Sequence, residues 1–268
     1  ITNEFTEVRE SWLKRQLSER YIAVYIDALQ VNIKRDTVAK EAFYIALAIK
    51  EDLTRDVLGV WCNPTESKDG WNEVMLDIKS RGVQDVLIFV ADGFTGLRDT
   101  VKQHFKRADF QRCIVHKKRN IINKVRQSDK AAIAEDLKDL FQLERHDYLF
   151  TDAKNKVYEF SKKWGSKYKT LLKTFPRDGL DDYFAYLKYP TKIQRMIYTT
   201  NSIESLNKKI RRTIKIRGSF PSEDSAMNLI CAYLIEHCDK NLYKYKITSL
   251  LEIKDKLAIM MKERIKSQ

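Results

Sequence analysis

The order of strand-like and helix-like segments constrains the fold of this chain most strongly. Three segments rich in β-branched and aromatic residues come first and are joined by short polar turns, as antiparallel strands are: "YIAVYIDALQVNI" at 21–33, "EAFYIALAI" at 41–49 and "RDVLGVWC" at 55–62. Helical and strand-like segments then alternate: a helix over 69–82 that ends at Gly82, a strand over 85–91, a helix over 96–105 and a strand over 110–115. This order predicts a mixed α/β sheet flanked by helices.

The pattern changes between residues 117 and 197, where helical periodicity dominates. One helix is predicted over 129–144, and a second over 152–175 with a possible break at Gly165. We therefore expect an all-helical domain inserted into the α/β domain. The predicted parts are a lead segment over 1–20, a core over 21–116, the helical insertion over 117–197, a second part of the core over 198–238 and a helical tail over 239–268. Helices in the last two parts are predicted over 202–216, 222–238 and 248–266.

The charge of the chain points to a polyanionic partner. Fifty basic and 37 acidic side chains give a formal charge of +13, and nucleic acid is the commonest partner of such a protein. The longest apolar run, "VLIFVA" at 86–91, is too short to cross a bilayer, and the first ten residues do not resemble a signal peptide. Four cysteines without disulfide-scaffold spacing favour a reducing compartment. The first residue is Ile, so residue 1 is not taken as a biological start.

Two aspartates follow apolar strand-like runs. Asp27 comes after "YIAVYI" and Asp92 after "VLIFVA", so each is expected where a strand meets solvent. If the two strands are parallel neighbours, both carboxylates enter one crevice and repel each other unless a cation lies between them. Hard oxygen ligands of this kind suit Mg²⁺ or Mn²⁺. The alternative is that each aspartate is a turn or cap residue.

A third carboxylate lies in the strongly basic segment "YTTNSIESLNKKIRRTIKIR" at 198–217. On a helix that begins near Asn201, Glu204 shares one face with Lys208, Arg211 and Lys215. A different stripe is apolar and can pack on the sheet: Ile203, Leu206, Ile210 and Ile214. Glu204 is thus a candidate third metal ligand followed by phosphate-binding cations, and two metals about 3.5–4 Å apart could act on a phosphodiester. The alternative is a capping box between Asn201 and Glu204.

Six motifs give the chain a resemblance to a known family over about residues 20–238. They are "YIDALQV" around Asp27, "VADGFTGL" around Asp92, "QRCIVHKKRN" at 111–120, "KWGSKY" at 163–168, "YTTNSIESLNKKIRR" at 198–212 and "RGSFPSEDSAMNL" at 217–229. In these the chain resembles the catalytic region of bacterial insertion-sequence transposases of the Mutator superfamily. The resemblance implies an RNase H-like fold with a helical insertion before the last catalytic acid. It also implies a metal-binding catalytic triad of two aspartates and a glutamate at Asp27, Asp92 and Glu204.

The resemblance further implies partners and a cofactor. We expect Mg²⁺ or Mn²⁺, transposon terminal inverted repeats and target DNA, at least a homodimer in the DNA complex, no membrane, and a place at the nucleoid in the bacterial cytoplasm. Family members usually recognise the repeats with an N-terminal helix-turn-helix region, and only a short segment precedes residue 20 here. We therefore do not expect this chain alone to recognise the ends. The alternatives are an RNase H-like nuclease that does not join strands, a non-catalytic DNA-binding module and a helical scaffold.

Cys113 and His116 form a C-x-x-H pair that allows three interpretations. A zinc site would need two further ligands, and the candidates are Cys62, His104, His146, Cys231, His237 and Cys238. The resemblance instead identifies the pair with a superfamily signature near the active site, and it implies supporting roles there for Arg119, Asn120 and Asn201. A buried structural pair is the third interpretation.

The remaining candidates are basic and aromatic. Residues predicted to contact the DNA backbone are Lys117, Lys118, Lys124, Arg126, Lys208, Arg211, Arg212 and Lys215. The alternative for the cluster at 117–126 is an ordinary solvated helix face. Trp164 could stack on an unpaired base, although a Trp among helical apolar positions is more often a core residue. Trp61 and Trp71 are predicted to pack.

Overall fold

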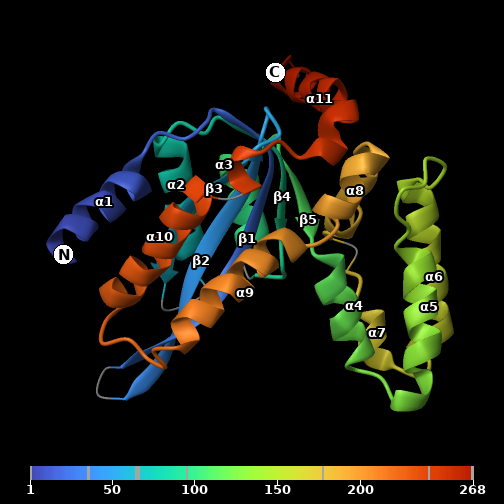
Figure 1. The fold of residues 1–268 in the computed structure, drawn as a ribbon. Coiled ribbons are helices and arrows are strands. Elements are labelled where there is room, and N and C mark those ends of the chain that lie inside the picture. The colour runs from blue at the N-terminus through green and yellow to red at the C-terminus, as the bar shows by residue number, and fades with distance from the viewer. Residues whose placement is uncertain are drawn as a thin grey trace. The chain divides into compact units, whose positions relative to one another are not determined.

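A computed structural model describes residues 2–34, 37–63, 67–94, 96–176, 178–240 and 242–266. Its five strands form one mixed sheet in the order β3-β2-β1-β4-β5 (Figure 1). The strands are β1 (Arg20–Lys34), β2 (Val38–Lys50), β3 (Arg55–Asn63), β4 (Asp85–Ala91) and β5 (Asp109–Arg112). The predicted sequence of three strands, helix, strand, helix and strand is therefore confirmed.

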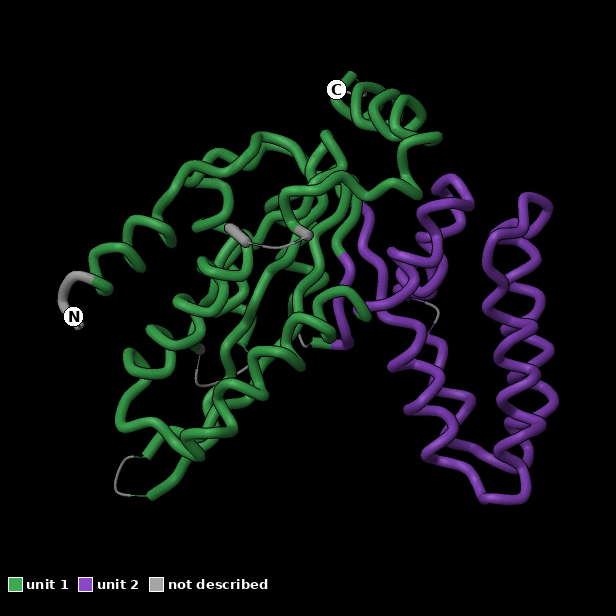
Figure 2. Tube along the Cα trace, viewed as in Figure 1, with its two compact units in different colours: residues 1–89, 94–108, 201–268 green, residues 90–93, 109–200 purple. Residues whose placement is uncertain are grey.

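The chain divides into two compact units, which Figure 2 shows in different colours. Unit 1 comprises residues 1–89, 94–108 and 201–268, and unit 2 comprises residues 90–93 and 109–200. The helices of unit 1 are α1 (Thr2–Lys14), α2 (Lys68–Ser80), α3 (Leu97–His104), α9 (Asn201–Lys215), α10 (Glu223–Lys240) and α11 (Lys254–Lys266). Two 3-10 helices, η4 (Leu242–Lys244) and η5 (Thr248–Ile253), also belong to this unit.

The described elements of unit 2 beyond β5 are helices. They are α4 (Ile114–Ile122), α5 (Lys130–Leu140), α6 (Phe150–Gly165), α7 (Lys169–Leu172) and α8 (Thr191–Ile197), with the 3-10 helices η1 (Gln127–Asp129), η2 (Asp181–Tyr183) and η3 (Ala185–Lys188). Of all the helices in the described part of the chain, none is long and apolar enough to cross a membrane.

Unit 1 is built on a long antiparallel hairpin. β1 pairs with β2 from Tyr21 and Lys50 to Lys34 and Val38, and β2 pairs antiparallel with β3. The side chains from Tyr21 to Ile26 are all buried, which explains why β1 begins as a continuous apolar run rather than an alternating one. Helix α9 packs against β1 and β2, and α10 packs against β1 and β3.

Helix α2 closes another part of this core, as its sequence periodicity predicts. Trp71, Val74, Met75 and Ile78 are all buried, and the Trp71 ring centroid lies 4.3 Å from that of Tyr44. Ser67 caps the N-terminus of this helix, and its hydroxyl accepts a 3.1 Å hydrogen bond from the backbone N–H of Gly70. It stops before Gly82, whose φ of +105° suits a glycine. The packing predicted for Trp71 is confirmed, and Trp61 donates a 3.1 Å hydrogen bond to Asp77.

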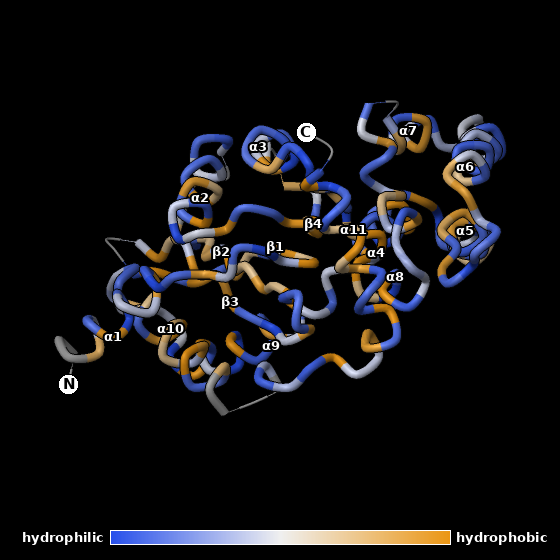
Figure 3. The backbone as a smooth tube through the Cα atoms, turned by 90° about the horizontal axis from the view of Figure 1, so that it is seen from above, coloured by the Kyte–Doolittle hydropathy of each residue, from blue (hydrophilic) through white to orange (hydrophobic). Residues whose placement is uncertain are grey.

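In unit 2, the helices α5 and α6 are amphipathic, and Figure 3 shows apolar and polar residues alternating along both. Four apolar residues at helical spacing in the predicted helix over 129–144 are buried: Ile133, Leu137, Leu140 and Phe141. Trp164 is 8% exposed, and its indole donates a 2.6 Å hydrogen bond to Asp136. It is therefore a core residue.

The predicted helix over 152–175 is divided into α6 and α7 at the glycine that the sequence suggested. Gly165 ends α6, and a Cβ atom there would lie 2.2 Å from the Leu172 side chain. A side chain at this position would therefore have to displace the exposed side chain of Leu172 on α7.

Two predicted boundaries are wrong. The strand predicted over 110–115 ends at Arg112, because the chain turns at Cys113 and Ile114 begins α4. The helix predicted over 248–266 begins with the 3-10 helix η5 and becomes α-helical only at Lys254.

Candidate functional site

Asp27 lies in the middle of the fifteen-residue strand β1, opposite Ile45 of β2. The prediction that it ends a strand is wrong, because the β1–β2 ladder continues past it as far as Lys34 and Val38. The residues after Asp27 include Leu29, Val31 and Ile33, all buried, so a polar residue interrupts the apolar run without ending the strand.

The neighbour of Asp27 is an asparagine that the sequence reasoning missed. Asn207 is 0% exposed on α9, and its side-chain amide donates a 2.8 Å hydrogen bond to the Asp27 carboxylate. The amide oxygen of Asn207 is also buried and has no hydrogen-bond partner among the described residues. A signal was present in the sequence, because Asn207 lies four residues after Ile203 and therefore continues the apolar stripe of the helix.

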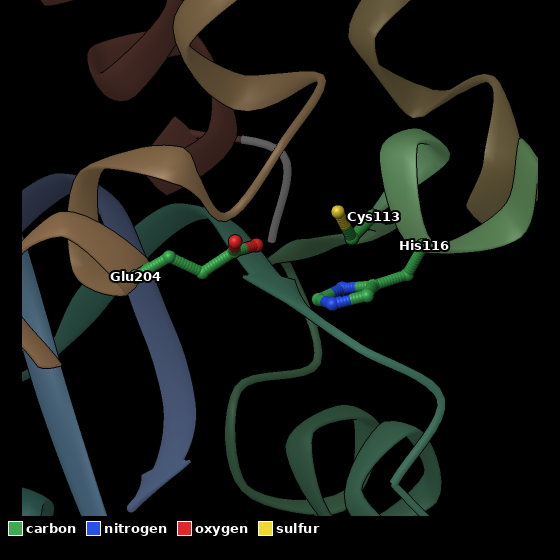
Figure 4. Close-up of side chains that lie close together, drawn as sticks. All are labelled: Cys113, His116 and Glu204. Carbon is green, nitrogen blue, oxygen red and sulfur yellow. The ribbon is translucent and has the colours of Figure 1, made fainter. Parts of the chain in front are cut away.

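Helix α9 otherwise has the two faces predicted for it. Ile203, Leu206, Ile210 and Ile214 are buried, whereas the cations Lys208, Arg211, Arg212 and Lys215 are exposed. Glu204 is half-buried and projects from the first turns of the helix (Figure 4). The capping box proposed for Asn201 and Glu204 stays a prediction.

Glu204 acts electrostatically on Asp27 within unit 1. Burial raises the pKa of Asp27 above its usual value, and the negative charge of Glu204 raises it further. The hydrogen bonds from Asn207 and the Ala28 backbone, together with the charge of Arg211, lower this pKa without cancelling the rise. The Asp27 carboxylate and the nearby negative charge of Glu204 form a donor set that a divalent cation would fit, because its charge removes the repulsion.

Asp92 is described with unit 2 and lies directly after β4, as predicted. Its carboxylate accepts a 2.7 Å hydrogen bond from the backbone of Gly93 and lies 3.6 Å from Nδ1 of His116. With 39% of its side chain exposed, Asp92 is accessible to a ligand. Thr95 of the "VADGFTGL" motif lies outside the described residues.

Cys113 and His116 lie on either side of the start of α4, as Figure 4 shows. Cys113 is 2% exposed, and its sulfur accepts a 3.3 Å hydrogen bond from the hydroxyl of Thr200. Burial raises the pKa of the Cys113 thiol, but hydrogen bonds with His116 and Thr200 outweigh it and lower the pKa to about 7. Among the described residues of unit 2, no third Cys, His, Asp or Glu completes a compact ligand group with the pair, so the unit does not supply a zinc site by itself.

The basic cluster at 117–126 is not a uniform solvated face. Arg119, Asn120, Lys124 and Arg126 are exposed, but Lys117 and Lys118 are half-buried. The Lys118 ammonium lies 5.6 Å from the centroid of the Phe141 ring, in cation–π range, and burial lowers its pKa to about 8. Whether these side chains contact DNA stays a prediction.

Comparisons with known proteins agree with the motifs. Residues 1–244 match the family "Transposase, Mutator family". The chain is 35% identical over 225 residues to the transposase for insertion sequence element IS1201 of Lactobacillus helveticus, covering 84% of this chain and 60% of that protein. It is 33% identical over 267 residues to a probable transposase for insertion sequence element ISRM3-like of Sinorhizobium fredii, covering 98% of this chain and 65% of the relative.

A more distant relative is the transposase for insertion sequence element IS256 in transposon Tn4001 of Staphylococcus aureus, 28% identical over 246 residues and covered over 62% of its length. The chain thus spans about 60–65% of the length of these relatives. From the family match and the two relatives above 30% identity, we conclude that the chain belongs to the Mutator family of transposases.

Proposed function

We propose that this chain is the catalytic region of a DNA transposase, which cuts phosphodiesters at transposon ends and joins the freed 3′-hydroxyl to target DNA. The observation that carries the proposal is the half-buried carboxylate of Asp27, which is held at 2.8 Å by the amide of Asn207 on the same helix that carries Glu204. A half-buried carboxylate beside a second negative charge is costly in a metal-free protein and is favoured where a cation binds. The names of the relatives, all transposases for insertion sequence elements, support the same reaction class.

The proposed fold is RNase H-like. Its support is the chain order of three antiparallel strands followed by two strands that alternate with helices, arranged as β3-β2-β1-β4-β5. The helices α4 to α8, which stand between β5 and α9 in the chain, agree with the proposed insertion before the last catalytic acid.

In this mechanism Asp27, Asp92 and Glu204 hold Mg²⁺ or Mn²⁺. When bound, the metal would activate the attacking oxygen and stabilise the leaving oxygen of the phosphodiester. Asn207 orients the Asp27 carboxylate through its 2.8 Å hydrogen bond to one carboxylate oxygen. The exposed cations of α9, which begin at Lys208, hold the phosphate backbone beside the carboxylates.

A strand-transfer assay tests the function. The full-length transposase that contains this chain is incubated with pre-cleaved oligonucleotides of the element's own ends and with target DNA. We expect joined product in Mg²⁺ or Mn²⁺, and its loss in Asp27→Ala, Asp92→Ala and Glu204→Ala. The matched control is Glu73→Gln, which changes an exposed carboxylate on α2 and should leave joining unchanged. Cleavage without any joined product would favour the nuclease alternative, and activity that survives all three alanine variants would contradict the triad.

A further inference from the structure

Unit 2 contains a cavity of about 230 Å³ that the proposed reaction does not yet use. Four cationic side chains line it, from Arg112, Lys117, Lys124 and Lys173, and the carboxylate among its lining residues is that of Asp92. Its volume lies below the roughly 300–1,000 Å³ of small-molecule sites, so it offers room for a small anionic group rather than for a whole cofactor.

Lys117 is the most deeply placed of these cations. Its ammonium lies 4.2 Å from the centroid of the Tyr183 ring and 4.7 Å from that of Phe175, and it donates a 3.0 Å hydrogen bond to the Tyr183 hydroxyl. It also donates to the carbonyl oxygen of Thr174. Two aromatic faces and two neutral oxygens hold the amine in place, and none of these groups supplies a counter-charge.

The other cations leave the cavity positive. Arg112 lies 3.8 Å from Asp182, so its charge is partly compensated. Lys124 and Lys173 are exposed at the cavity, where they add two positive charges. An anion with several acceptor oxygens suits such a lining, because both lysines and the Arg112 guanidinium can donate to it.

We propose that this cavity binds a backbone phosphate of the DNA strand, next to the phosphodiester that is cut. The inference rests on the proposed function, since the presence of Asp92 in the lining is what places the bound phosphate beside the scissile one. It adds Arg112, Lys173 and Tyr183 to the residues that contact DNA, and none of the three stands out in the sequence as a phosphate ligand.

The test is the salt dependence of DNA binding, measured by fluorescence anisotropy with the whole chain and a labelled duplex oligonucleotide in EDTA. Each lost phosphate contact reduces the slope of log K against log salt concentration by about 0.9 for duplex DNA. We expect reductions of that size in Lys124→Ala and in Lys173→Ala. Both side chains are exposed, so their removal should leave the fold intact. The matched control is Lys162→Ala, because Lys162 is exposed on α6 of the same unit and is not among the residues that line the cavity.

Slopes for Lys124→Ala and Lys173→Ala that equal the wild-type slope would overturn the proposal, as would an equal reduction in Lys162→Ala. These failures differ from a failure of the proposed function. Joined product in the strand-transfer assay together with unchanged slopes would contradict only the proposal that the cavity binds a DNA phosphate. Reduced slopes without joined product would support the cavity as a DNA-phosphate site and would contradict the proposed transposase mechanism.

Discussion

The side-chain amide of Asn207 lies 2.8 Å from the carboxylate of Asp27, although the two residues are 180 positions apart in the chain. One is buried on α9 and the other lies in the middle of β1. Since Glu204 lies less than one helical turn before Asn207, the same stretch of α9 supplies the hydrogen bond that holds Asp27 and the charge that opposes its ionisation. This arrangement links the packing of the helix to the proposed metal chemistry.

Asn207→Ala should weaken metal binding without removing a proposed ligand. A residue that hydrogen-bonds to a metal ligand typically contributes about 10–100-fold to the affinity for the metal. The variant loses the hydrogen bond that fixes the carboxylate of Asp27. Titration with Mn²⁺, followed by electron paramagnetic resonance or calorimetry, measures the loss. Ser205→Ala is the control, because Ser205 is exposed on the same helix. Equal Mn²⁺ affinity in the two variants would show that Asn207 does not position Asp27.

Asp27→Asn should stabilise the metal-free protein. The substitution removes a half-buried negative charge that Glu204 repels and keeps an oxygen that can accept the hydrogen bond from Asn207. The melting temperature in EDTA should therefore rise, by about 2–4 °C for each kcal/mol gained in a chain of this size. Addition of Mg²⁺ should stabilise the wild type and not the variant.

The control for this comparison is Glu73→Gln, which removes an exposed charge from α2. If the melting temperature falls in Asp27→Asn and is unchanged in Glu73→Gln, the charge of Asp27 does not destabilise the metal-free protein. That result would contradict the prediction.

DNA affinity should depend on pH through Lys117. Burial lowers the pKa of Lys117 to about 7, and the positive charges of Arg112 and Lys124 add to the effect. Lys173 and Asp92 also line the cavity, and Tyr183 contributes a hydroxyl. A phosphate in the cavity would raise the pKa of Lys117, so binding takes up a proton and affinity falls as the pH rises above 7, by at most about tenfold per unit for one proton.

Anisotropy titrations in EDTA, from about half a unit below the pKa of Lys117 to about two units above it, measure this dependence. Lys117→Arg should remove the part of the dependence that belongs to this amine, since a guanidinium stays protonated throughout. The Cys113 thiol, which also lines the cavity and has a pKa of about 7, titrates in both proteins. A pH dependence that is identical in the variant and the wild type would assign the proton to another group.

Trp164 should matter for stability and not for base stacking. Trp164→Ala removes a buried indole and its hydrogen bond to Asp136, and such a change costs about 3–5 kcal/mol of unfolding free energy. Trp164→Phe keeps most of the packing and should restore much of that loss. Denaturant unfolding measures both, and DNA affinity of Trp164→Phe should equal that of the wild type. A large loss of affinity in a stably folded Trp164→Phe protein would favour the stacking role.

The fold could be read from the sequence where a local pattern determines it. The strands and the buried face of α9 follow from apolar runs and helical periodicity, and Asp92 was placed correctly because Gly93 and a turn follow it. Asp27 was misplaced because one polar residue in an apolar run looks like an end. The apolar segment over 21–33 already extended past Asp27, and its pairing with β2 shows that the whole segment is one strand.

The parts of the site that escaped prediction depend on contacts between distant segments. Asn207 reads as one more polar residue in a basic helix, and its partner on β1 is invisible in the local sequence. Lys117 likewise looks like part of a solvated basic cluster, whereas Phe175 and Tyr183 enclose it from much later in the chain. Periodicity predicts which side a residue faces, but not what it meets there.

The most direct test of the account is a manganese soak of crystals of the full-length transposase bound to its DNA ends. The account predicts anomalous difference density in contact with the carboxylates of Asp27, Asp92 and Glu204, and its absence in Asp27→Asn crystals treated in the same way. Manganese bound elsewhere, with any of these three carboxylates turned away from it in the assembled complex, would contradict the proposed catalytic site.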